Sequence, residues 1–106
     1  MTAGARAHRI ALQEPVVTLV SGESSTVWTM RATRWARIEP LDGRELWRAR
    51  QVQADVTHRI TLPWETSLQP TTQWRVLFEG RVFQLLSVVR PAERRIEWVL
   101  LAKEAV

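Results

Sequence analysis

Residues 73–90 read QWRVLFEGRVFQLLSVVR, two apolar runs that meet at the dipeptide Glu79-Gly80. Short runs rich in Val, Leu and Phe and bounded by turn residues are typical of β-strands. A glycine in a two-residue connection supplies the positive φ that a tight hairpin turn requires. The stretch therefore predicts a β-hairpin, and its apolar strands indicate that the hairpin is part of a larger sheet.

The sequence on both sides of this hairpin supplies more strands. Pro15 interrupts the first of them, and residues 26–39 fit one long or bent strand. Residues 21–25 (SGESS) and 91–94 (PAER) have the composition of turns. The further strand-like stretches are residues 8–13, 16–20, 26–39, 57–62 and 96–103.

About six strands with short turns predict a mostly β fold, a small antiparallel β-barrel or sandwich. We expect one domain that spans residues 1–106. Apolar runs such as VFQLLSVV place apolar side chains on both faces of a strand, which indicates a second covering surface such as a neighbouring subunit. The residues expected inside or at subunit contacts are Ile10, Leu12, Val27, Trp35, Ile38, Ile60, Leu62, Val76, Phe78, Val82, Phe83, Leu85, Val88, Trp98 and Leu100.

Residues 42–55 break the strand pattern. Asp42 can N-cap a helix, and Glu45 lies three residues later, in the position of a capping box. The following run has good helix formers, but its apolar residues make no single stripe. We therefore expect a short helix or ordered loop that projects from the β scaffold, where contact functions tend to lie.

The composition is that of an ordinary globular protein, with 45% apolar and 25% charged residues and a net charge of +4. This balance argues against intrinsic disorder. The chain has no cysteine, which excludes disulfides, thiolate metal sites and cysteine nucleophiles. No apolar run approaches the roughly 20 residues that span a bilayer, and no signal peptide is visible. We expect no membrane partner.

Catalytic motifs are missing from the sequence. His8 and His58, the two histidines, both lie in predicted strands, and neither has a nucleophile or metal-ligand motif around it. We expect both to be structural or surface residues. We therefore predict no enzyme activity, no metal site and no cofactor.

Arginine and tryptophan are overrepresented, with fourteen Arg to one Lys and six Trp to no Tyr. Both residue types are enriched at interfaces, although genome base composition also explains arginine richness. Residues 31–50 carry a net charge of +3 and are interleaved with Trp28, Trp35 and Trp47. Because small barrels bind single strands by stacking bases beside a basic groove, a nucleic-acid-binding barrel is an alternative function.

Several blocks in order resemble the head-closure, or head–tail adaptor, family of long-tailed bacteriophages. Residues 35–45 (WARIEPLDGRE) are similar to the family's pattern WA-x-φ-x-P-φ-x-GRE, where φ is apolar. Residues 75–83 (RVLFEGRVF), with the later Ser87-Val88, resemble its second hairpin. The other matching blocks are residues 7–15, 57–60, 93–95 and 101–104. Residues 62–70 depart from the family because they lack Gly and add Trp64.

The resemblance implies a structural virion protein, a small β-barrel that assembles as a ring, either a hexamer or a dodecamer. Such a ring lies beneath the portal and adaptor, closes the DNA-filled head, and presents a surface to the tail terminator or tail tube. Packaged DNA passes through its channel. The protein would be assembled in the bacterial cytoplasm and located at the head–tail junction of a phage, prophage or gene transfer agent particle. A tail-terminator-like ring is a related alternative.

Within this scheme, the projecting segment supplies the candidate site. We expect Arg44, Arg48 and Arg50 to face the channel lumen or acidic loops of the adaptor, with a solvated helix face as the alternative. Trp47 and Trp64 are candidate interface anchors, with partial burial against the barrel as the alternative.

Overall fold

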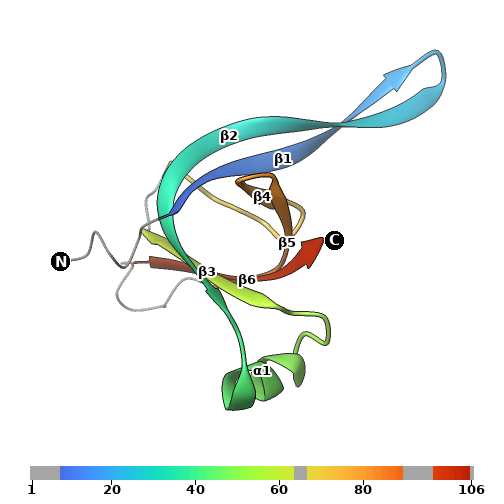
Figure 1. The fold of residues 1–106 in the computed structure, drawn as a ribbon. Coiled ribbons are helices and arrows are strands. Elements are labelled where there is room, and N and C mark those ends of the chain that lie inside the picture. Colours follow the sequence, from blue (N-terminus) through green and yellow to red (C-terminus); the bar gives the residue numbers. More distant parts are fainter. Residues whose placement is uncertain (1–7, 64–66, 90–96, 106) are drawn as a thin grey trace.

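The structure is a computed structural model and describes residues 8–63, 67–89 and 97–105. In this part of the chain, six strands and one short helix follow one another (Figure 1). They are β1 (His8–Val20), β2 (Glu23–Pro40), α1 (Gly43–Arg50), β3 (His58–Pro63), β4 (Arg75–Phe78), β5 (Arg81–Val89) and β6 (Glu97–Ala105).

The strands close into an antiparallel barrel in the order β1-β2-β3-β6-β5-β4, with β4 pairing back onto β1. Each neighbouring pair is antiparallel, so side chains alternate between the barrel interior and the outer surface. Closure removes free edges from the barrel itself. The predicted mostly β barrel with a short helix inserted after residue 42 is confirmed.

Two hairpin turns have positive φ at both central residues. Glu79 and Gly80 have φ of 50° and 79° and join Phe78 to Arg81, as the sequence predicts. The φ values of Ser21 and Gly22 are 53° and 82°, which also match a type I′ turn. The broader turn expected over residues 21–25 is wrong, because β2 already begins at Glu23 and pairs with Val20.

The β1–β2 hairpin extends well beyond the barrel, and we call residues 15–30 the arm (Figure 1). Pairing of β1 with β4 ends at Gln13, so within the described ranges the rest of β1 pairs with β2 alone. The sequence predicted that Pro15 interrupts the strand, but β1 continues through it. Proline has no backbone N–H to donate, and it is tolerated here because β1 beyond Gln13 is an edge strand within the described residues. A bulge at Arg31, where Leu12 pairs with Ala32 but Gln13 with Met30, marks the transition from barrel to arm.

The core fills the barrel interior, and Phe83 is its largest fully buried side chain. Most of the predicted core residues are buried or packed against this cluster. Val27 and Trp35 are exposed in the chain, because Val27 lies on the arm and Trp35 on the outer face opposite Arg9. The core also contains residues that the strand pattern did not select: Ala36, Leu68, Trp74 and Ala102.

Candidate functional site

The projecting segment between β2 and β3 is anchored at both ends. Leu41 and Val56 are buried, one on each side of the segment. The backbone N–H of Leu41 donates to the carbonyl of Thr57 (3.0 Å), and the N–H of Thr57 donates to Ala102 on β6 (2.9 Å). These contacts close the base of the segment, so α1 is held in a defined position beside the barrel (Figure 1).

The first turn of α1 is joined to the sheet by ion pairs. Asp42 occupies the N-cap position but makes no side-chain cap hydrogen bond, so the predicted capping box is wrong. The carboxylate of Glu45 instead contacts Arg59 of β3 at 2.9 Å. Arg59 also pairs with Glu39 at 3.3 Å, and Glu39 with Arg37 at 3.3 Å. This chain of charges links β2, β3 and α1.

The two faces of α1 differ in exposure. Leu46 and Ala49 are half-buried, whereas Arg44, Trp47 and Arg48 are exposed. Residues at positions i, i+3 and i+4 of a helix share a face, so these three exposed side chains lie together. The Trp47 side chain is 65% exposed. We call this set (Arg44, Trp47, Arg48) the α1 face.

The third predicted arginine, Arg50, is also exposed and follows Trp47 by three positions, but it lies on the opposite side of the helix from Arg48. Arg50 follows Leu46 by one turn, and its Nε donates to the carbonyl of Val56 at 3.4 Å. Within the described residues, neither Arg44 nor Arg48 forms an ion pair. The structure therefore brings together Arg44, Arg48 and the predicted anchor Trp47, but not Arg50. The other predicted anchor, Trp64, lies outside the described residues.

The residues of the alternative basic groove are dispersed. Trp28 lies at the base of the arm, with the Arg75 guanidinium 4.1 Å from its ring centroid. Trp35 lies on the outer face of the barrel beneath Arg9 at 5.7 Å. Trp47 lies on α1. The three tryptophans that are interleaved with arginine in the sequence therefore line no common groove.

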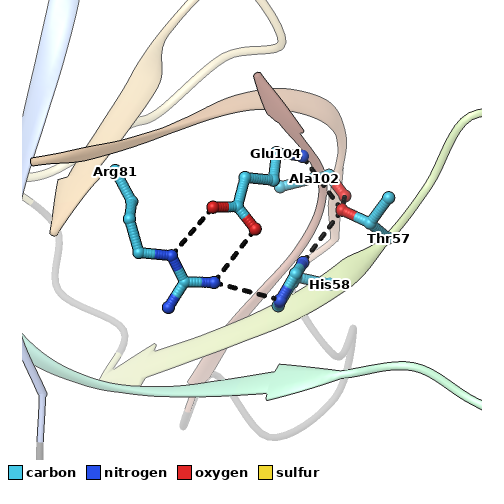
Figure 2. A network of polar contacts seen from close by, with 5 residues as sticks. All are labelled: Thr57, His58, Arg81, Ala102 and Glu104. Carbon is cyan, nitrogen blue, oxygen red and sulfur yellow. Dashed lines mark hydrogen bonds and ion pairs between the residues drawn. The ribbon is translucent and has the colours of Figure 1, made fainter. Parts of the chain in front are cut away.

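A polar network ties three strands together at one end of the barrel (Figure 2). Arg81 of β5 donates through Nε (2.8 Å) and Nη2 (3.0 Å) to the two carboxylate oxygens of Glu104 on β6. The Arg81 Nη2 also approaches His58 Nε2 of β3 at 3.5 Å, and His58 Nδ1 lies 2.9 Å from Thr57 Oγ1. The Thr57 oxygen accepts the N–H of Glu104 at 2.9 Å.

Within this network His58 contacts Thr57 and links β3 to Arg81 of β5. Arg81 Nη2 can only donate, so His58 Nε2 accepts and Nδ1–H donates to Thr57, which is the arrangement of a neutral ring. Burial lowers the pKa of His58, with Arg81 acting in the same direction and Glu104 opposing them. The hydrogen bonds from Arg81 lower the pKa of Glu104 below its ordinary value. No nucleophile or substrate position is part of this arrangement.

Residues 8–63, 67–89 and 97–105 contain no group of three His or carboxylate side chains that could hold a metal ion. They also contain no helix long and apolar enough to cross a bilayer.

Known proteins of the same fold include two of low sequence identity. Protein SF1141 from Shigella flexneri 2a superposes with a TM-score of 0.81 at 22% identity, over 100% of this chain and 98% of that protein. A chain from the virion of a native gene transfer agent particle gives a TM-score of 0.64 at 18% identity, over 92% and 94% of the two chains. Among curated proteins, no sequence matches the chain.

At the sequence level, the pattern of one protein family extends over residues 1–105. That range includes the whole barrel, the arm and the α1 segment. The chain therefore belongs to the phage head completion protein family, which indicates a structural role in a phage head.

Proposed function

We propose that the chain forms a ring at the head–tail junction, closes the DNA-filled head and provides the surface to which the tail attaches. Six or twelve copies would lie beneath the portal or adaptor ring and above the tail terminator or tail tube, with DNA passing through the channel. Membership of the head completion family supports the location. The shared fold with a chain of a gene transfer agent virion supports a place in such a particle. The proposed role involves no catalysis and no cofactor.

The α1 face is the observation that carries this proposal. A small closed barrel holds Arg44, Trp47 and Arg48 outward on a segment anchored by Leu41 and Val56. An exposed tryptophan flanked by two arginines that lack carboxylate partners among the described residues is typical of a contact surface. We propose that this face meets the channel lumen or acidic loops of the adaptor ring.

The mixed charge around the α1 face is compatible with a channel through which DNA passes. Glu45 and Asp42 lie beside Arg44, so the local charge is mixed. A dense ring of positive charge would hold the phosphates of DNA by counterion release and slow their passage. Two arginines per subunit, with carboxylates nearby in the sequence, would contact the DNA backbone without holding it tightly.

The first experiment is co-sedimentation of the purified chain with DNA-filled, tailless heads at low and moderate salt, with free DNA as competitor. We expect attachment that ignores free DNA, survives moderate salt and retains the packaged genome. Salt-sensitive binding to free DNA without attachment to heads would contradict the connector role. That result would favour the nucleic-acid-binding alternative. An exposed tryptophan between two arginines is also compatible with that function, because bases stack on aromatic rings beside basic side chains.

Charge reversal tests the α1 face within the same assay. Arg44→Glu with Arg48→Glu should leave the thermal unfolding midpoint nearly unchanged, because both side chains are exposed and make no ion pair among the described residues. Attachment to heads or DNA retention should fall about fivefold or more. Arg44→Glu and Arg48→Glu are also tested one at a time. Lys103→Glu, which reverses one exposed charge on β6, is the control for these single variants. Unchanged particle infectivity or gene transfer would remove this face from the proposal.

Preferential binding to isolated tail tubes would indicate the remaining alternative, a tail-terminator-like ring. The co-sedimentation assay separates the two rings when tubes replace heads.

A further inference from the structure

The arm has a surface that a soluble monomer rarely exposes. Of its sixteen residues, Glu23 is the single charged one. Beyond the bulge, β1 and β2 pair only with each other among the described residues, so the two edges of the arm carry backbone groups without a strand partner in this part of the chain. Proteins usually protect such edges with charges, prolines near the middle or a covering element. The exposed large apolar residues of the arm are Val17, Leu19, Val20, Val27 and Met30.

A covered position is therefore expected for the arm in the assembled state. The tip is its most apolar exposed part, since Leu19 is 75% and Val20 is 66% exposed. Glu23 pairs directly with Val20 across the hairpin and has no ion-pair or hydrogen-bond partner among the described residues. The tip thus presents Val20 and the carboxylate of Glu23 on one face and Leu19 on the other.

A hollow of about 610 Å³ lies at the other end of the same hairpin. Trp35 and Phe78 give it aromatic walls, and the ring of His8 meets Phe78 edge-on at 4.9 Å. Arg9 stands at the hollow with its guanidinium over Trp35, hydrogen-bonded to Thr33 but without a carboxylate partner among the described residues. Glu79 completes the lining.

Tip and hollow are complementary in chemistry. Aliphatic side chains of the tip suit aromatic walls, and the carboxylate of Glu23 suits the guanidinium of Arg9.

The arm cannot reach the hollow of its own chain. From His8 to Leu19, β1 is one continuous strand, and eleven residues at about 3.3 Å each separate the two sites by roughly 35 Å. The tip that fills a hollow must therefore come from another copy. Because tip and hollow are different patches, the contact is heterologous, and such contacts repeat around a ring.

We infer that the arm tip (Leu19, Val20 and Glu23) docks into the hollow formed by His8, Arg9, Trp35, Phe78 and Glu79 of the next copy of this chain. The inference rests on the proposed ring and names the surfaces that join its subunits. It leaves the α1 face, which projects on the other side of the barrel (Figure 1), free for other contacts.

The chain contains no cysteine, so engineered disulfides test the contact directly. We would introduce Leu19→Cys and Glu79→Cys into one chain, let it assemble into particles in the producing strain, oxidise the purified particles and separate them without reductant. A disulfide needs Cα atoms within about 7 Å, so no bond can form inside one subunit. We expect a ladder of covalent multimers larger than a dimer.

Three control variants define the ladder. A variant with either cysteine alone should form covalent dimers at most. The third control combines Leu19→Cys with Val52→Cys, which places the second thiol at an exposed site after α1. This variant should form no ladder of multimers. A variant present in particles that remains monomeric, or that cross-links to a different virion protein, would overturn the inference and leave the proposed function intact. Absence of the unmodified chain from particles would instead overturn the proposed function.

A second test exchanges the charges of Glu23 and Arg9. It applies even when the variant with two cysteines is not incorporated into particles. Glu23→Arg or Arg9→Glu alone should lower incorporation into particles by about fivefold, and the two together should restore it to about half the native level or more. Normal incorporation of both single variants, or no recovery in the double variant, would contradict the docking.

Discussion

At the scale of single residues, the environment of His58 gives the stability of the chain a dependence on pH. Its ring is neutral in the fold, with Nε2 facing the Arg81 guanidinium. Burial, reinforced by Arg81, lowers its pKa below the ordinary value of 6.5, so the unfolded chain binds a proton more readily. The stabilising effect of the neutral ring is complete above pH 6.5 and is lost as the pH falls through the folded-state pKa.

We therefore expect the thermal unfolding midpoint to fall between pH 7.5 and about pH 5. His58→Gln should flatten this decline, because the side chain no longer binds a proton. His8→Gln, the matched control, should retain it. A native-like slope in the His58 variant would show that other groups set the pH dependence. The Glu104 carboxylate, whose pKa is lowered by the hydrogen bonds from Arg81, adds a further loss at pH values below its ordinary 4.5.

Phe83 is the residue on which the core most depends. It is fully buried, meets the His58 ring edge-on at 5.0 Å and lies on β5 between two neighbouring strands. Phe83→Ala should lower the free energy of unfolding by about 3–5 kcal/mol because it leaves a cavity. Val89→Ala, a truncation of an exposed residue on the same strand, should change it by about 0.5 kcal/mol or less. Chemical denaturation of both variants measures the contrast.

At the scale of elements, both tight hairpins use a suboptimal residue at the first turn position. Glu79 and Ser21 have positive φ, a conformation that Asn adopts more readily than either. Nothing lies within 4 Å of a Cβ added at Gly80, so a substitution there has a purely conformational cost.

Glu79→Asn should therefore raise the free energy of unfolding by roughly 0.5 kcal/mol, and Gly80→Ala should lower it by about 1–2 kcal/mol. Urea titrations of the two variants, compared with the native chain, test these opposite signs. Equal effects of the two changes would show that the turn does not retain its type I′ geometry.

At the scale of the whole molecule, core and projections are separate. Every residue of the core cluster lies outside the arm, and α1 has no buried residue. Stability therefore resides in the barrel, which also has the hollow on its surface. The arm and α1, which carry the other surfaces proposed for assembly, stand away from the barrel (Figure 1). The longest dimension of the described chain, 50 Å against 29 Å in the other two directions, reflects these projections.

A shortened arm tests this separation. Val16 pairs with Val27, so replacing residues 17–26 with Asn-Gly joins them by a two-residue turn and keeps the contact between Trp28 and Arg75. We expect the barrel to fold with a thermal midpoint within about 5 °C of the native value. Incorporation into particles should be lost. Efficient incorporation of this variant would show that the arm is dispensable for assembly.

Local patterns in the sequence were sufficient for most of the strands and for the turn at Glu79-Gly80, but not for the continuity of β1 through Pro15. They also predicted the exposed helix, because residues 45–50 favour a helix without an apolar stripe that would bury it. They were insufficient for Glu45, whose sequence neighbours suggested a helix cap but whose partner, Arg59, comes from β3. Trp74 was missed for a similar reason, since its burial depends on the way the chain before β4 folds over the core.

The class of fold, the positions of most strands and the family can be inferred from the order of residues alone, because they depend on alternation, turn residues and the order of short motifs within the chain. Contacts between distant residues depend on how the strands pair in three dimensions. The tertiary structure placed Trp47 with Arg44 and Arg48 but separated Arg50, and it extended β1 through Pro15 into an arm. Strand register and the end of pairing with β4 fix these features. They are long-range interactions, and no local pattern specifies them.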